Sequence, residues 1–181
     1  MDLVDLIAEK RFLGQEFLAW LWYKSDERGG TIRLPSAGDI VLVFEKHLLL
    51  EYGEGEALEK VICQGLQAEL REARTGLALG KKPEQARLRI GIDAYEYLVT
   101  VKGSTMEYRS VKLPKTMNAA EELDEQAARE GMLLDRIGLY ERLVRSIDEL
   151  FRMFIEVRTG DRWPEEVAHI RSWIQQGAHQ E

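Results

Sequence analysis

The chain has 181 residues, of which 45% are apolar and 31% charged, and it carries a formal charge of -7 at pH 7. This composition is that of a globular domain with its own hydrophobic core, and it excludes disorder of the whole chain. The acidic balance argues against bulk attraction to nucleic acid or to an anionic membrane, although it leaves room for a local basic surface.

The N-terminal residues and the single cysteine indicate the compartment. The apolar run at residues 17–23 is far shorter than the roughly 20 residues of a membrane span. Acidic residues at Asp2, Asp5 and Glu9 interrupt the N-terminus, so it does not resemble a secretory leader. Cys63 cannot form an internal disulfide, which agrees with a reducing compartment, and its context predicts a small buried strand residue. We therefore expect a cytoplasmic protein with no membrane contact.

The first predicted element is a helix that starts near Asp5 and includes the stretch RFLGQEFLAWLWYKS at residues 11–25. At helical spacing, Trp20 and Trp22 point in nearly opposite directions. A helix that is apolar over most of its circumference must be covered on two sides by other elements. We expect this helix to be the central element of the fold.

A first β meander is predicted after this helix. Its strands are residues 32–34, 40–44, 48–52 and 58–63. Residues 66–79 then have helical spacing, and Gly80 is the predicted C-cap because Pro83 follows closely.

A second β meander is predicted between residues 87 and 113. Residues 88–92 alternate between apolar and polar side chains, which is typical of a strand with one buried face. A two-residue turn at residues 93–94 would pair Ile90 with Tyr97, and Leu88 with Val99, on the apolar side.

The other side of this meander is predicted to be basic. It collects Arg87, Arg89, Thr100 and Lys102. A third strand at residues 107–113 adds Arg109 in one register and Lys112 in the other. Between residues 81 and 115 there are eight basic and four acidic residues, a net charge of +4. The candidate nucleic-acid-binding residues are Lys81, Lys82, Arg87, Arg89, Lys102, Arg109 and Lys112. Such a surface supports salt-sensitive, sequence-independent phosphate contacts, and the alternative interpretation is a solvated sheet surface.

The C-terminal third is predicted to be helical. Residues 115–130 are polar and predict either a linker or an exposed helix with Asn118 as N-cap. Residues 133–158 predict one long helix with two apolar stripes, one for the first helix or the sheet and one for a second copy of the chain. A last helix follows Asp161, its predicted N-cap. We expect an α+β core domain at residues 1–115 and a helical extension at residues 116–181.

No residue pattern predicts catalysis, a cofactor or a metal. The run GLALGKK has three residues between its glycines where a phosphate loop has four, and the three histidines lack ligand spacing. Asp135 and Glu141 could hold magnesium for a nuclease, but nothing distinguishes them from a solvated helix surface. We therefore expect a non-enzymatic protein, with a metal-dependent nuclease as a less favoured alternative.

Three stretches occur in a recognisable order. They are RFLGQEFLAWLWYKS at residues 11–25, EARTGLALGKKPEQARLRI at residues 72–90 and SVKLPK at residues 110–115. Together they resemble the C-terminal half of the recombination-associated protein RdgC family, as found in its shorter bacterial members. The resemblance covers most of residues 5–115 and, more loosely, the final helices.

The resemblance implies a nucleoid-associated protein that binds double-stranded DNA with little sequence preference and restrains the recombinase RecA. That family is often labelled a putative exonuclease, but it is better described as a dimeric ring with a basic interior. Family chains are longer, and their N-terminal half helps to close the ring, so a complete ring is not expected here.

Two functions from different classes remain. The leading hypothesis is a non-enzymatic homodimer that acts on DNA or on the recombination machinery through the basic sheet face. The alternative is a protein-interaction module whose exposed helical stripe docks a partner chain and which does not bind nucleic acid.

Overall fold

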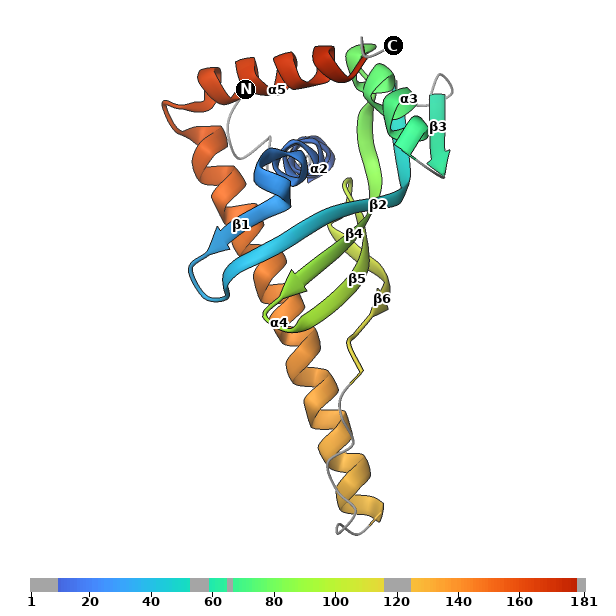
Figure 1. Cartoon of the computed structure of the whole chain (residues 1–181), viewed down its shortest axis with the longest axis vertical. Coiled ribbons are helices and arrows are strands. Elements are labelled where there is room, and N and C mark those ends of the chain that lie inside the picture. The colour runs from blue at the N-terminus through green and yellow to red at the C-terminus, as the bar shows by residue number, and fades with distance from the viewer. Residues whose placement is uncertain (1–9, 53–58, 65–66, 116–124, 179–181) are drawn as a thin grey trace.

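A computed structural model describes residues 10–52, 59–64, 67–115 and 125–178. In chain order the elements are α2 (Lys10–Asp26), the 3-10 helix η1 (Glu27–Gly30), β1 (Thr31–Leu34), β2 (Gly38–Tyr52), β3 (Glu59–Gln64), α3 (Gln67–Ala78), β4 (Lys82–Ile92), β5 (Tyr95–Lys102), β6 (Glu107–Lys112), α4 (Glu125–Thr159) and α5 (Trp163–Ala178). Helices pack against an antiparallel sheet (Figure 1). The predicted α+β class, with an N-terminal helix, a long C-terminal helix and a final shorter helix, is confirmed.

The two predicted meanders join into one six-stranded sheet. The strand order is β1-β2-β4-β5-β6, and β3 pairs with the distal part of β2. Residues 40–44 and 48–52, predicted as separate strands, belong to the single strand β2. Between Phe44 and Leu48 the register against β4 shifts, because Phe44 lies opposite Leu88 and Leu48 opposite Ala86. The polar residues inside this bulge interrupt the apolar alternation, which is why the sequence suggested a break.

Helix α2 is the central element, as predicted. The Trp20 ring lies 5.8 Å from the Phe154 ring of α4, and the Trp22 ring lies 5.9 Å from Phe44 of the sheet. Trp22 also packs edge-on against Trp173 of α5, with the ring centroids 5.4 Å apart. Both α2 tryptophans are at most 2% exposed. The helix is therefore covered on two sides, which its circumferential apolar pattern requires.

The N-terminal half of α2 is fixed against the turn that joins β5 to β6. A Cβ atom on Gly14 would lie 1.8 Å from the carbonyl oxygen of Gly103, so only glycine permits this approach. The Gln15 amide donates to the buried Glu84 carboxylate at 2.8 Å, and the Ser104 hydroxyl donates to its other oxygen. These two donors compensate the cost of burying the Glu84 carboxylate.

The C-terminal end of α2 is tied to α3 and α5. The Asp26 carboxylate accepts hydrogen bonds from the Arg74 guanidinium and, at 3.0 Å, from the indole nitrogen of Trp173. Lys24 lies 2.8 Å from Glu166 of α5. Ion pairs and aromatic packing therefore hold the same three helices together.

Two predicted local features are confirmed. Gly80 has a φ of 86°. Its N–H donates to Leu77 and the following N–H of Lys81 donates to Gly76, which is the hydrogen-bond pattern of a Schellman C-cap. In the β4–β5 hairpin, Ile90 lies opposite Tyr97, and Leu88 opposite Val99, as the two-residue turn predicted.

Helix α4 begins at Glu125, eight residues before the predicted start. Residues 125–131 are mostly polar, so they gave no periodic apolar signal. The predicted N-cap Asn118 lies outside the described residues. The predicted N-cap Asp161 precedes α5 by two residues, because that helix begins at Trp163. The division at residues 115 and 116 stays a prediction, although α4 contributes to the same hydrophobic cluster as α2.

Candidate functional site

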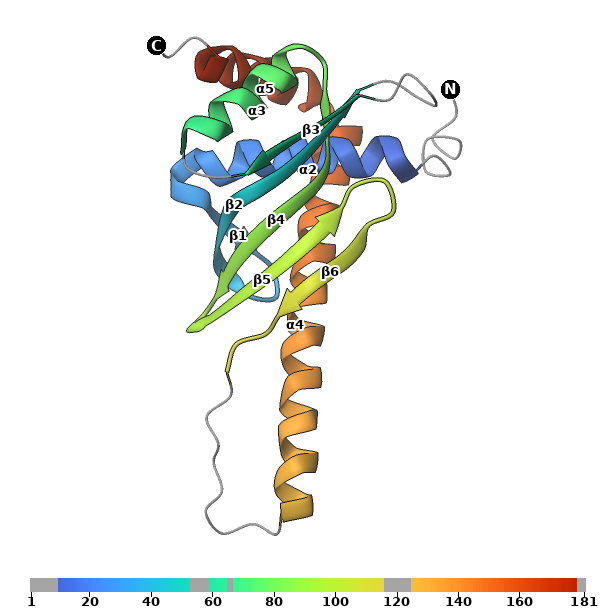
Figure 2. The same cartoon turned by 90° about the vertical axis from the view of Figure 1, so that its right-hand side faces the viewer.

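The sheet has one covered face and one open face. In Figure 2, β4, β5 and β6 face the viewer, and α2 and α4 lie behind them. Along the strands, buried apolar residues alternate with residues that point to the opposite side. The buried set is Ile40, Leu42, Phe44, Leu88, Ile90, Ile92, Tyr97, Val99 and Val101. We call the opposite side of β2, β4, β5 and β6 the open face.

Basic residues of three strands meet on the open face. Arg87 lies opposite Thr100, and Thr100 lies opposite Arg109. In the next row Arg89 lies opposite Leu98. Lys102 completes the group at the end of β5, opposite Gln85 and Glu107. Cross-strand partners point to the same side of an antiparallel sheet, so these side chains share one surface.

Both residues that the sequence offered as alternatives on β6 lie on the open face. Arg109 pairs with Thr100 and Lys112 pairs with Leu98, so three steps along β6 match two steps along β5. The extra residue forms a β-bulge at which Ser110 has a positive φ of 49°. This bulge returns Lys112 to the side that Arg109 already occupies.

The two remaining candidates lie elsewhere. Lys81 precedes β4, and its ammonium group is 2.9 Å from the Glu59 carboxylate of β3. Lys82 begins β4 and lies opposite Glu51 of β2. The structure therefore brings together five of the seven predicted residues, and it places Lys81 and Lys82 at the far end of the sheet beside acidic partners.

Acidic residues neutralise part of the open face. Arg89 donates to Glu45 at 2.6 Å and lies 3.4 Å from Glu96. Arg109 donates to Glu107 at 2.6 Å, and this hydrogen bond lowers the pKa of the Glu107 carboxyl. The sequence-based prediction named Arg89 and Arg109 as phosphate-binding residues but did not identify these carboxylates as their partners. Glu96 could have been found, because it lies opposite Gly91 in the predicted hairpin, whereas Glu45 comes from β2 and depends on the β2–β4 pairing.

Three basic residues of the open face lie outside these ion pairs, although the charge of Lys102, opposite Glu107, also helps to lower the pKa of that carboxyl. Within the described part of the chain, Arg87, Lys102 and Lys112 have no ion-pair partner within 4.0 Å. Around the five basic residues, the carboxylates of Glu45, Glu96 and Glu107 leave an excess of two positive charges, and Asp39 of β2 adds a further carboxylate that pairs with Arg33 of β1. The open face is therefore basic, but weakly.

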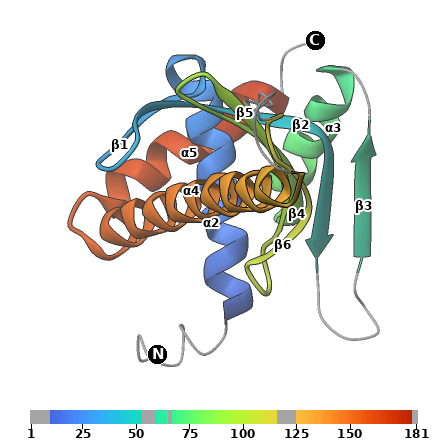
Figure 3. The ribbon, with the colours of Figure 1, turned by 90° about the horizontal axis from the view of Figure 1, so that it is seen from below.

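The open face is convex. Seen along α4 in Figure 3, the strands curve partway around that helix, and the open face is turned outward. The described part of the chain therefore presents this face as an outward-curving surface and not as a concave channel.

A second surface lies on the N-terminal half of α4, residues 125–140, which we call the projecting half. Figure 2 shows it extending beyond the sheet. Leu133, Leu134 and Ile137 are 60%, 68% and 46% exposed, and Met132 and Tyr140 are also exposed. A cluster of large exposed apolar side chains is typical of a protein-interaction surface.

Neither surface has the features of a metal centre. Among the described residues, no three histidine, cysteine or acidic side chains are grouped so that they could hold a metal ion. Asp135 and Glu141 are six residues apart on α4, so their side chains leave the helix in directions about 120° apart. None of the described helices is long and apolar enough to cross a membrane.

Comparisons with protein-family models, with curated proteins and with solved structures found no match. The resemblance to the RdgC family therefore rests on the three sequence stretches alone.

Proposed function

We propose that the protein is a non-enzymatic domain that binds double-stranded DNA through the open face and, like the RdgC family that it resembles, modulates recombination. The observation that carries the proposal is the β6 bulge, which adds both Arg109 and Lys112 to a face that already holds Arg87, Arg89 and Lys102. Arginine and lysine side chains on a rigid sheet are suited to contact phosphates without reading bases.

The charge distribution sets the expected strength of binding. Arg89 and Arg109 must exchange a carboxylate partner for a phosphate, so Arg87, Lys102 and Lys112 would supply most of the favourable energy. Three phosphate contacts give a salt slope of about -2.7, which corresponds to a loss of roughly 40-fold in affinity between 50 and 200 mM salt. Binding should therefore be weak and strongly salt-dependent.

Gel retardation of a long duplex at these two salt concentrations tests the proposal. The test variant replaces three unpaired residues, with the substitutions Arg87→Gln, Lys102→Gln and Lys112→Gln. We expect it to abolish the retardation seen with the natural chain at low salt.

A matched control separates the open face from net charge. It carries Arg136→Gln, Arg152→Gln and Arg171→Gln, which remove the same charge from exposed helical positions. We expect this control to keep most of the binding. Equal losses in the two variants would remove the open face from the proposal, and no retardation of the natural chain at low salt would remove DNA binding altogether.

A second candidate function is protein interaction through the projecting half of α4, which its exposed apolar side chains favour. The partner could be a second copy, giving the homodimer expected from the sequence, or the recombinase RecA. Sedimentation over a range of concentrations should show a dimer that the pair Leu133→Gln and Leu134→Gln converts to a monomer. A monomer at all concentrations would exclude self-association, and a nuclease-treated binding assay with purified RecA then tests the other partner.

A further inference from the structure

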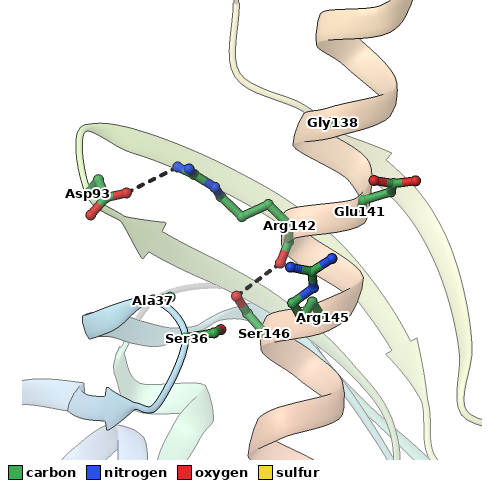
Figure 4. Close-up of a pocket in the computed structure, with 8 residues that line it drawn as sticks. All are labelled: Ser36, Ala37, Asp93, Gly138, Glu141, Arg142, Arg145 and Ser146. Carbon is green, nitrogen blue, oxygen red and sulfur yellow. Dashed lines mark hydrogen bonds and ion pairs between the residues drawn. The ribbon is translucent and has the colours of Figure 1, made fainter.

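A polar cavity of about 340 Å³ lies beside α4, on the covered side of the sheet and apart from the open face. Its walls come from three places: Ser36 in the β1–β2 turn, Asp93 in the β4–β5 turn, and α4, which contributes Gly138, Arg142 and Arg145 among others (Figure 4). The cavity is thus formed where two hairpin turns approach the helix.

One side of α4 forms the floor of this cavity. Gly138, Arg142 and Arg145 follow one another at spacings of four and three residues, so they lie on the same side of the helix. A Cβ atom on Gly138 would meet no other atom within 4 Å. Gly138 therefore leaves open space beside the two arginines, although no neighbouring atom requires a glycine at this position.

Hydrogen bonds hold the cavity walls in place. The Arg142 guanidinium lies 3.0 Å from the Asp93 carboxylate and so connects α4 to the β4–β5 turn. The backbone N–H of Ser36 donates to Glu149 of α4 at 3.2 Å, which fixes the β1–β2 turn. Two separate contacts thus set the distance between the turns and the helix.

The cavity lining carries two arginines and two carboxylates, so its formal charge is zero, but one guanidinium has no ion pair in the described part of the chain. Asp93 neutralises Arg142, whereas Arg145 has no ion-pair partner within the described residues. Glu141 also borders the cavity, but Figure 4 shows its carboxylate pointing away from Asp93 and Ser36. A group bound near Arg145 would therefore meet a guanidinium, the remaining N–H groups of Arg142 and the Ser36 hydroxyl.

We propose that this cavity binds the phosphate group of a small phosphorylated molecule. Guanidinium groups bind phosphate through paired, charge-assisted hydrogen bonds. A phosphate offers oxygens in three directions, which matches donors that come from α4 and from the β1–β2 turn better than the two oxygens of a carboxylate do. The volume is near the lower end of the range for small-molecule sites, about 300–1,000 Å³, and the polar walls disfavour an apolar ligand. This inference does not depend on DNA binding.

Titration of the ¹⁵N-labelled chain with inorganic phosphate at constant ionic strength tests the inference. We expect saturable chemical-shift changes at the amides of Ala37, Gly138 and Arg145, and no comparable change with acetate. The substitution Arg145→Gln should weaken phosphate binding at least tenfold. The variant should stay folded, because Arg145 is exposed and has no described ion-pair partner.

Two further variants make the result specific. Arg152→Gln removes the same charge two turns further along the same side of α4, outside the cavity, and should bind phosphate as the natural chain does. Gly138→Met should fill the cavity and abolish binding, while methionine suits a helix better than glycine does. The absence of saturable shifts, unchanged binding in Arg145→Gln, or an equal loss in Arg152→Gln would each overturn the inference.

Discussion

Helix α2 and the projecting half of α4 carry the same kind of sequence signal and end in opposite environments. Both have large apolar residues on more than one side. Leu21 of α2 is fully buried, whereas Leu134 of α4 is 68% exposed. Apolar periodicity therefore predicts a helix, whereas its burial depends on whether other elements reach it.

Length explains why α4 is only half covered. Its 35 residues span about 53 Å, because each residue of a helix adds 1.5 Å. The eight residues of β5 span only about 27 Å. The sheet and α2 therefore cover the half of α4 that contains Leu143, Leu150 and Phe154, all fully buried, and the other half extends past them (Figure 2).

The largest expected effect comes from truncating one leucine in each region. Leu21→Ala should lower the free energy of unfolding by about 2–5 kcal/mol, because it leaves a cavity in a packed core. Leu134→Ala should change it by less than about 0.5 kcal/mol, because the side chain is mostly in solvent. Urea denaturation of the two variants measures both values. A similar loss in both would mean that the projecting half is packed in solution.

A pair of glycines gives the next largest effect. Gly14→Ala should destabilise the protein by about 1–3 kcal/mol, because the methyl group would overlap the Gly103 carbonyl. Gly138→Ala should stabilise it by up to about 1 kcal/mol, because alanine is the better helix former and its methyl group enters open space. Thermal unfolding of the two variants should therefore shift in opposite directions, and a shift of the same sign would contradict the comparison.

The smallest effect concerns Tyr108 of β6, whose phenol lies near Asp148 in the covered half of α4. Burial, then the nearby negative charge of Asp148 on α4, raise the pKa of this phenol to about 12. Because the pKa is raised in the folded state, the associated stability is fully present below pH 10 and is lost as the pH rises through about 12.

Burial also raises the pKa of Tyr23 and of Tyr97, so absorbance titration should show more than one phenol that ionises above pH 10, and Tyr108→Phe should remove the one near pH 12. The same variant should flatten the loss of stability between pH 10 and pH 12. Ionisation of every tyrosine near pH 10 in the folded protein would place Tyr108 in solvent, away from Asp148.

Local features were predicted well because neighbouring residues decide them. The Gly80 cap, the two-residue turn at residues 93–94 and the pairing of Ile90 with Tyr97 all follow from short stretches of sequence. The bulges in β2 and β6 were not predicted, because a bulge is defined by the partner strand and the alternation of side chains alone does not reveal it.

The residues of the open face also divide into those that the sequence predicted and those that only the strand pairing shows. The sequence predicted that Arg87, Arg89 and Lys102 share a face, since alternation along paired strands places them there. Only the paired strands show that Arg109 and Lys112 both join them, and that Glu45 reaches Arg89 from β2.

Local sequence patterns were enough to predict the helices, most of the strands and the central position of α2, because periodicity and capping act over a few residues. The tertiary structure decided the charge balance of the open face, the exposure of the projecting half and the cavity beside Gly138. Each of these depends on which distant segments meet, and contacts between residues far apart in the chain leave no local pattern.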